Sequence, residues 1–169
     1  MNFMMETQLQ PDMPIEPKYG SLKVLTILTF IGSALAIFSG IYQYFSAEKN
    51  LAAMEKLMNS PDFAKMPDFA KSFYSPEAME LMRKAAANKL PILVVTLIGA
   101  LLCILGAIDM RKLKMQGYYM WLIGEIFPVM ATVILLGVAS VTGWTAYFGY
   151  AFLFLFIILY TTQRKYLIY

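Results

Sequence analysis

The chain has 169 residues, of which 59% are hydrophobic and 15% are charged, and it carries a formal net charge of +3. Soluble domains average about 45–50% apolar and about 25% charged residues, so this composition excludes an ordinary soluble domain and predicts a membrane protein. The absence of histidine excludes His-ligated haem or zinc and a Ser-His-Asp triad, and the single cysteine, Cys103, excludes an intrachain disulfide. The charges form no basic stripe, so we expect no nucleic-acid partner.

Residues 1–21 precede the first long apolar stretch, and we predict that they form a flexible cytoplasmic tail. Pro11, Pro14 and Pro17 recur at the three-residue period of a polyproline II helix. Such a stripe is either a ligand for an aromatic groove on a partner or the stiffened part of an unstructured tail. We favour the second interpretation.

Three long apolar stretches indicate four membrane spans. A helix needs about 20 apolar residues to cross a hydrocarbon core about 30 Å thick. Residues 24–47 and 90–108 carry no charge, and the 47 residues from 117 to 163 carry only Glu125, so this last stretch is long enough for two spans. Small, β-branched and glycine residues at 140–144 favour a turn between those two. The predicted spans are residues 22–46, 91–108, 118–140 and 144–163.

Basic residues near the ends of the spans predict the orientation. Lysine and arginine are enriched in cytoplasmic loops, and residues 111–114 contain three of them while residues 164–165 contain two. The turn after the third span contains none. We therefore expect a multi-pass protein of the cell membrane with both termini in the cytoplasm and residues 48–90 outside.

The predicted external segment, residues 48–90, has the pattern of short helices. Apolar residues at helical spacing continue the first span as far as Asn59. The pentapeptide that begins at Pro61 is repeated at Pro67, and residues 75–77 provide an N-cap serine, a proline and an acid for the first turn of a helix. The five methionines of this segment favour packing or partner contacts over a copper site, because no histidine or cysteine accompanies them.

Small residues at four-residue spacing mark possible packing stripes in the first two spans. Such stripes let helix backbones approach closely in lipid. We favour packing within the chain, and the alternative is a seam with a second copy or with a partner protein. The predicted helix-packing residues are Gly32, Ala36, Gly40, Gly99, Cys103 and Ala107.

Glu125 is the strongest functional signal, because it lies about 10 Å inside the predicted third span. An acid at this depth costs about 2–3 kcal/mol when charged, and no basic residue lies at the same depth in the other spans. We therefore expect it to hold its proton at neutral pH. Pro128 predicts a kink beside it, and Thr132 shares its helical face. The acid is either an interhelical hydrogen-bonding group, which we favour, or a proton or cation site coupled to the helix bend.

Together these features predict an all-α integral membrane protein, a four-transmembrane-helix bundle with an external helical segment between the first two spans. This layout is similar to that of tetraspan families such as claudins and tetraspanins. The cysteines characteristic of their external loops are absent here, so we assign the chain to no family.

The expected function is that of a non-catalytic accessory or scaffolding subunit that presents its external segment to a membrane-protein partner. The alternative is a small proton- or cation-coupled transporter or channel subunit that acts through Glu125 and assembles as a homo-oligomer. We expect the lipid bilayer as the environment of the spans, and neither a cofactor nor a metal.

The orientation is testable with single cysteines. In a Cys103→Ala background, Asn59→Cys reports on the external segment and Gln116→Cys on the loop after the second span. On intact cells, an impermeant thiol reagent is expected to label Asn59→Cys and to leave Gln116→Cys unlabelled until the cells are opened. Labelling of Gln116→Cys alone on intact cells would show that the protein has the opposite orientation.

Overall fold

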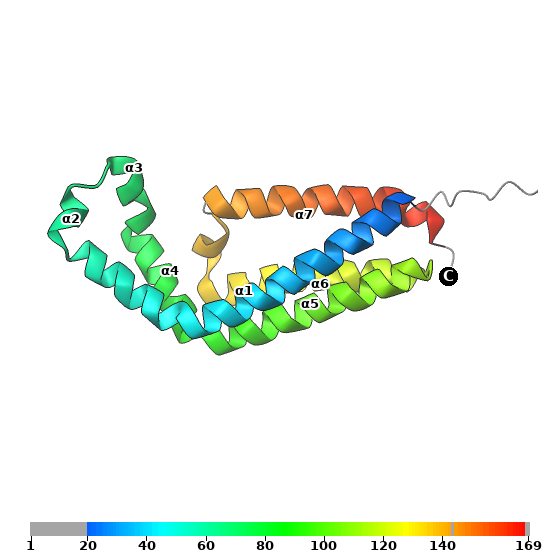
Figure 1. Cartoon of the computed structure of the whole chain (residues 1–169), viewed down its shortest axis with the longest axis horizontal. Coiled ribbons are helices and arrows are strands. Elements are labelled where there is room, and N and C mark those ends of the chain that lie inside the picture. Colours follow the sequence, from blue (N-terminus) through cyan, green and yellow to red (C-terminus); the bar gives the residue numbers. More distant parts are fainter. Residues whose placement is uncertain (1–19, 143, 168–169) are drawn as a thin grey trace, which may run out of the picture.

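The structure, a computed structural model, describes residues 20–142 and 144–167. The predicted tail with Pro11, Pro14 and Pro17 lies outside the described residues, apart from its last two positions. Throughout the described residues the regular elements are α-helices and short 3-10 helices, and four of the helices are long and apolar enough to cross a membrane. The predicted all-α class with four membrane-spanning helices is therefore confirmed (Figure 1).

Four long helices form the bundle: α1 (Gly20–Met58), α5 (Lys89–Arg111), α6 (Met115–Leu136) and α7 (Trp144–Gln163). α1 has 39 residues, so it is about 58 Å long, nearly twice the thickness of a hydrocarbon core. It therefore continues past the bilayer as one helix. α1 begins and α7 ends at the same end of the bundle, which we call the terminal end (Figure 1).

The arm, residues 48–88, consists of the last part of α1 and the elements that return to the bundle. These elements are α2 (Pro61–Ala64), α3 (Asp68–Lys71), the 3-10 helix η1 (Ser72–Tyr74) and α4 (Pro76–Ala87). Each copy of the pentapeptide thus contributes one helical turn.

α4 begins with the cap that its sequence predicts. The Ser75 hydroxyl accepts a hydrogen bond from the Ala78 backbone N–H at 3.2 Å. The pKa of the Glu77 carboxyl lies below its usual value, because its own backbone N–H and the Ser75 hydroxyl stabilise the charged form. Both interactions satisfy groups at the start of the helix and fix where α4 begins.

α6 ends earlier than the predicted third span. Its last residue is Leu136, and Gly137 follows with a φ of 89°, a conformation that favours glycine. The 3-10 helix η2 (Val138–Val141) occupies the stretch in which the span was predicted to end. Hydropathy misses this boundary because most residues of η2 are as apolar as the helix before them.

The α5–α6 pair is held together at glycines where the two backbones meet. A Cβ atom on Gly106 would lie 2.6 Å from the Trp121 backbone nitrogen, and one on Gly124 would lie 2.8 Å from the Gly99 carbonyl oxygen. Real Cβ atoms do not come so close, so a larger residue fits only if the helices move apart. Gly99 pairs with Gly124 and Gly106 pairs with Gly117 across the antiparallel helices. We call this contact the glycine seam.

α1 and α7 complete the bundle in different ways. α1 packs along α5 and buries a row of hydroxyl residues, Thr26, Thr29 and Ser33. α7 continues into the 3-10 helix η3 (Arg164–Tyr166) at the terminal end. Toward its own N-terminus, α7 diverges from α1 and α6 (Figure 1).

From the glycine seam we predict which glycine can be replaced by alanine without loss of stability. Gly106→Ala places a methyl group against the backbone of α6 and is expected to lower the free energy of unfolding by roughly 1–3 kcal/mol, measured from the thermal midpoint in mild detergent. Gly32→Ala is the matched control, because no atom lies within 4 Å of its Cβ position. Alanine favours a helix over glycine by about 1 kcal/mol, so the control keeps or raises the midpoint. Equal midpoints for the two variants would contradict the seam.

Candidate functional site

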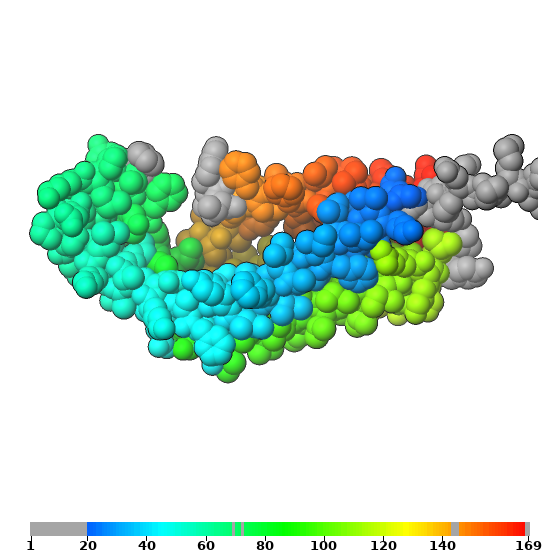
Figure 2. All heavy atoms as spheres, in the orientation of Figure 1, coloured from blue at the N-terminus to red at the C-terminus, as the bar shows by residue number. Residues whose placement is uncertain are grey.

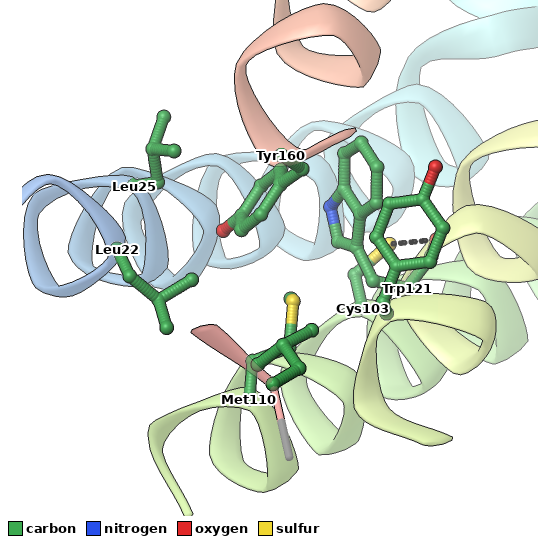
Figure 3. Close-up of a cluster of buried hydrophobic side chains, with 8 residues drawn as sticks. Leu22, Leu25, Cys103, Met110, Trp121 and Tyr160 are labelled. Carbon is green, nitrogen blue, oxygen red and sulfur yellow. Dashed lines mark hydrogen bonds between the residues drawn. The ribbon is translucent and has the colours of Figure 1, made fainter. Parts of the chain in front are cut away.

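The half of the bundle near the terminal end contains the hydrophobic core. Trp121 of α6 and Tyr160 of α7 are the largest buried side chains there, with ring centroids 4.3 Å apart. Leu22 of α1 and Cys103 and Met110 of α5 belong to the same cluster (Figure 3). Side chains from all four spans therefore meet at this level.

Two pairs of hydroxyl groups join α7 to its neighbours at the edge of this core. The Tyr160 and Thr29 hydroxyls lie 2.7 Å apart and connect α7 to α1. The Tyr118 and Thr161 hydroxyls lie 2.9 Å apart and connect α6 to α7. Interhelical hydrogen bonds in membrane proteins contribute on average about 0.6 kcal/mol and at most about 1.7 kcal/mol.

Two arginines form hydrogen bonds between helices at the terminal end. Arg164, directly after α7, donates a hydrogen bond to the Tyr119 hydroxyl at 2.9 Å, and its guanidinium lies 5.8 Å from the centre of the Tyr118 ring. Arg111, the last residue of α5, donates to the Thr26 hydroxyl at 3.0 Å. The contacts of Tyr160, Thr161 and Arg164 therefore anchor the last turns of α7 to its neighbours.

A cleft opens beside this core, between α1, α6 and α7. Its volume is about 230 Å³, and the space-filling view shows the surface hollowed between α1 and the first half of α7 (Figure 2). Because α7 is anchored at one end and diverges at the other, the cleft opens sideways, between two membrane-spanning helices. We call it the lateral cleft. Its lining includes Thr29, Gly32, Ser33, Glu125, Phe152 and Phe156.

Glu125 supplies the carboxyl group of the lateral cleft, and its neighbours there are neutral donors, the Cys103 thiol and the Trp121 indole. The Cys103 thiol lies 3.7 Å from Glu125 Oε1 and 3.8 Å from the Trp121 carbonyl oxygen, and its single weak S–H donor can serve only one of them at a time. Among the described residues, no lysine or arginine forms an ion pair with Glu125.

Two neighbouring polar groups also lack partners. The Ser33 hydroxyl lines the cleft and makes no hydrogen bond to another described residue. The indole Nε1 of Trp121, one turn from Glu125 on α6, is buried and lies near the Glu125 carboxyl group, but it reaches no acceptor among the described residues at full hydrogen-bond geometry. This region therefore has hydrogen-bonding capacity that the described residues do not fully use.

Pro128 and Thr132, which the sequence groups with Glu125, lie outside the lining of the cleft. Pro128 packs at Gly99 of α5, beside the glycine seam. The Thr132 hydroxyl donates to the Pro128 carbonyl oxygen at 2.7 Å, so its hydrogen bond stays within its own helix. The structure thus places Glu125 with Cys103 and Ser33 instead of with Thr132.

The predicted packing residues of the second span are all buried. Gly99, Cys103 and Ala107 lie in the interior of the bundle, and the first two approach α6 closely, because a Cβ atom on Gly124 would contact both. The prediction missed Gly106, the other α5 glycine of the seam, which lies one residue before Ala107.

The stripe of the first span divides between two environments. Gly40 lies against α5, with its Cβ position 3.2 Å from the Thr96 methyl group, and Ala36 is half-buried. Gly32 does not make the expected contact within the chain. No atom of residues 20–142 or 144–167 lies within 4 Å of its Cβ position, because α7 diverges there and leaves the cleft open.

Two sequence signals point to the residues that the prediction missed. The hydroxyl residues of α1 recur at helical spacing, Thr26, Thr29 and Ser33, which marks one buried polar face. The seam glycines of α5 and α6 recur every seven residues, which is two helical turns. Tyr160 carries no such signal, because it lies among many other large residues of α7.

Comparison with known proteins adds no assignment. No family model matches the sequence, and no curated protein and no solved structure is similar to it. Function therefore has to be inferred from the chemistry and geometry of the chain itself.

Tyr160 and Glu125 give opposite predictions for stability. Tyr160→Phe removes the hydroxyl bonded to Thr29 and is expected to lower the free energy of unfolding by about 0.6–1.7 kcal/mol, measured by thermal unfolding in mild detergent. Tyr147→Phe is the matched control, because that side chain is 57% exposed. Glu125→Gln is expected to keep the native midpoint, since the amide oxygen of glutamine can still accept from the Cys103 thiol. A large loss in Glu125→Gln would instead show that a charged Glu125 is paired.

Proposed function

We propose that this chain is a non-catalytic subunit of a membrane complex and that its arm is the surface presented to a membrane-protein partner. The observation that carries this proposal is the continuity of α1, which crosses the membrane and enters the arm as a single helix. A partner bound to the arm is thereby held at a fixed distance and direction from the bundle. The non-catalytic part rests on composition, because a chain with no histidine and one cysteine has few groups for acid–base or nucleophilic catalysis.

Ion pairs hold the two helices of the arm together and join the arm to the bundle. Arg83 of α4 donates two hydrogen bonds to Glu55 Oε1 of α1, at 2.9 and 3.2 Å. At the base of the arm, Lys89 pairs with Glu48 at 2.6 Å and lies 5.3 Å from the centre of the Tyr44 ring. Exposed pairs of this kind contribute only about 0–1 kcal/mol each. The Arg83–Glu55 pair joins α4 to α1, and the Lys89–Glu48 pair joins α5 to α1.

The tip of the arm exposes an aromatic side chain on this support. Phe73 of η1 is 61% exposed, and the nearby Phe63 and Tyr74 rings meet edge to face with centroids 5.9 Å apart. Each pentapeptide adds an Asp–Lys pair at 3.5 Å, which gives the tip a charged rim. An aromatic centre with a polar rim is typical of protein–protein interfaces.

The proposal includes a location in the cell membrane with both termini in the cytoplasm and the arm outside. The basic residues of 111–114 and 164–165 gather at the terminal end, away from the arm (Figure 1). The positive-inside rule assigns such an end to the cytoplasm.

A second candidate function is a proton- or cation-coupled transporter or channel subunit that acts through Glu125. The observation that favours it is the position of Glu125 in the lateral cleft without a basic partner among the described residues. One lateral cleft is not a path across a membrane, so this function requires a second copy of the chain.

The proposal is tested by recovering the protein with its neighbours from native membranes. After crosslinking and extraction in mild detergent, we expect a stoichiometric membrane-protein partner whose crosslinks, located by mass spectrometry, fall in the arm. Phe73→Ala is expected to reduce partner recovery about 30-fold, the effect of losing an interface residue worth about 2 kcal/mol.

Phe154→Ala is the matched control for this experiment. Phe154 is as exposed as Phe73, at 63%, but lies on α7, so the variant is expected to keep the partner. Recovery of a homo-oligomer alone, with its crosslinks in the bundle, would contradict the accessory function and favour the second candidate.

A further inference from the structure

The lateral cleft is accessible from lipid. Its wall helices α1 and α7 expose large apolar side chains beside it, among them Leu28 and Phe152. A molecule that enters between these helices therefore arrives from the hydrocarbon phase, and its own body has to be mostly apolar. Small ligand sites of this kind are apolar pockets with a few placed polar groups.

The polar groups of the cleft select the sign of the ligand's charge. Among the described residues, the Glu125 carboxyl group has the Cys103 thiol at 3.7 Å and the Trp121 indole as neutral neighbours and no basic partner. Ser33 lines the same cleft, and its hydroxyl has no partner among the described residues. A charged carboxylate in this apolar setting costs about 2–3 kcal/mol when it is alone, and a ligand cation removes that cost. When no cation is bound, the carboxyl group is expected to keep its proton, and a cation that binds stabilises the carboxylate as this proton leaves to water. An anionic ligand gains no such attraction from the site.

The walls and size of the cleft select the shape of the cation. Phe152 and Phe156 line it from α7, and aromatic faces attract ammonium groups in desolvated sites by up to about 2 kcal/mol. The volume of about 230 Å³ exceeds the roughly 150 Å³ of an apolar cavity that holds one benzene ring. One ring or one alkylammonium group therefore fits, and a longer tail remains in the lipid.

A metal cation fits this cleft poorly. Hard cations take six or more oxygen ligands, whereas the cleft offers the carboxyl group of Glu125 and the hydroxyl of Ser33, and the Thr29 hydroxyl is already bonded to Tyr160. No cluster of three metal-ligating side chains is present among residues 20–142 and 144–167.

We propose that the lateral cleft is a binding site for a hydrophobic organic cation, an amine or quaternary ammonium whose charged group sits against Glu125 and between Phe152 and Phe156. This inference is independent of the arm and its partner. It names the class of ligand for a site that the accessory function does not use.

The test uses the full chain in phosphatidylcholine vesicles and a pair of isosteric compounds. Benzyltrimethylammonium is the cation, and neopentylbenzene, in which carbon replaces the nitrogen, is its neutral counterpart. In a Trp144→Phe background, Trp121 is the single tryptophan and reports binding by its fluorescence from one turn away from Glu125. We expect saturable binding of the cation, at least 10-fold tighter than binding of the neutral compound, and at least a 10-fold loss of that binding in Glu125→Gln.

A second pair of variants keeps Glu125 in place. Gly32→Leu fills the cleft from α1, where no atom now lies within 4 Å of the Cβ position, and is expected to abolish binding of the cation. Gly20→Leu is the matched control, because it has the same open surroundings but lies outside the cleft lining. The inference is overturned by an absence of saturable cation binding, by equal binding of both compounds, or by unchanged cation binding in Gly32→Leu.

Discussion

The close approach of α5 and α6 at the glycine seam is the constraint on which the rest of the structure depends. At Gly106 and Gly117 the two backbones leave no space for a side chain. In lipid, apolar side chains gain little by leaving their surroundings, so helices associate through close packing and hydrogen bonds instead of the hydrophobic effect. The seam supplies that packing for two of the four spans, and the other two helices pack against the pair that it forms.

α7 has no comparable seam, and its different attachment follows from that. Its single glycine, Gly149, has no atom within 4 Å of its Cβ position, and most of its other residues are large and apolar. A helix with such faces cannot bring its backbone close to a neighbour, so polar contacts at its end hold it, through Tyr160 and through Arg164. The opposite half of α7 then stands apart, and the lateral cleft is the space that results.

The features that the sequence predicted correctly are those that depend on neighbouring residues. Apolar periodicity predicts the continuation of α1 beyond the bilayer, and Ser75 predicts the start of α4, because both signals lie within the helix concerned. The glycines show the limit of such reasoning. Gly32 and Gly106 look alike in the sequence, yet one lines a cleft and the other touches a backbone. Which helix lies opposite a small residue depends on the side-chain volumes of several spans together, and no local pattern contains that information. Glu125 shows both what the sequence predicts and what it does not. Its depth in the membrane follows from the sequence, whereas the cleft around it results from the divergence of α7.

The glycine seam also determines where Glu125 points. Gly124 faces α5 so closely that its Cβ position lies 2.8 Å from the Cys103 Sγ. Successive residues of an α-helix point about 100° apart, so with Gly124 on the seam, Glu125 is turned toward α1 and α7, where it lines the cleft. A rotation of α6 that carried the acid out to lipid would turn the seam glycines away from α5. Cys103 contacts both residues, because it packs on Gly124 and its thiol lies 3.7 Å from Glu125 Oε1. The contact that holds two helices together therefore also keeps an acid in the cleft, where it has no basic partner among the described residues.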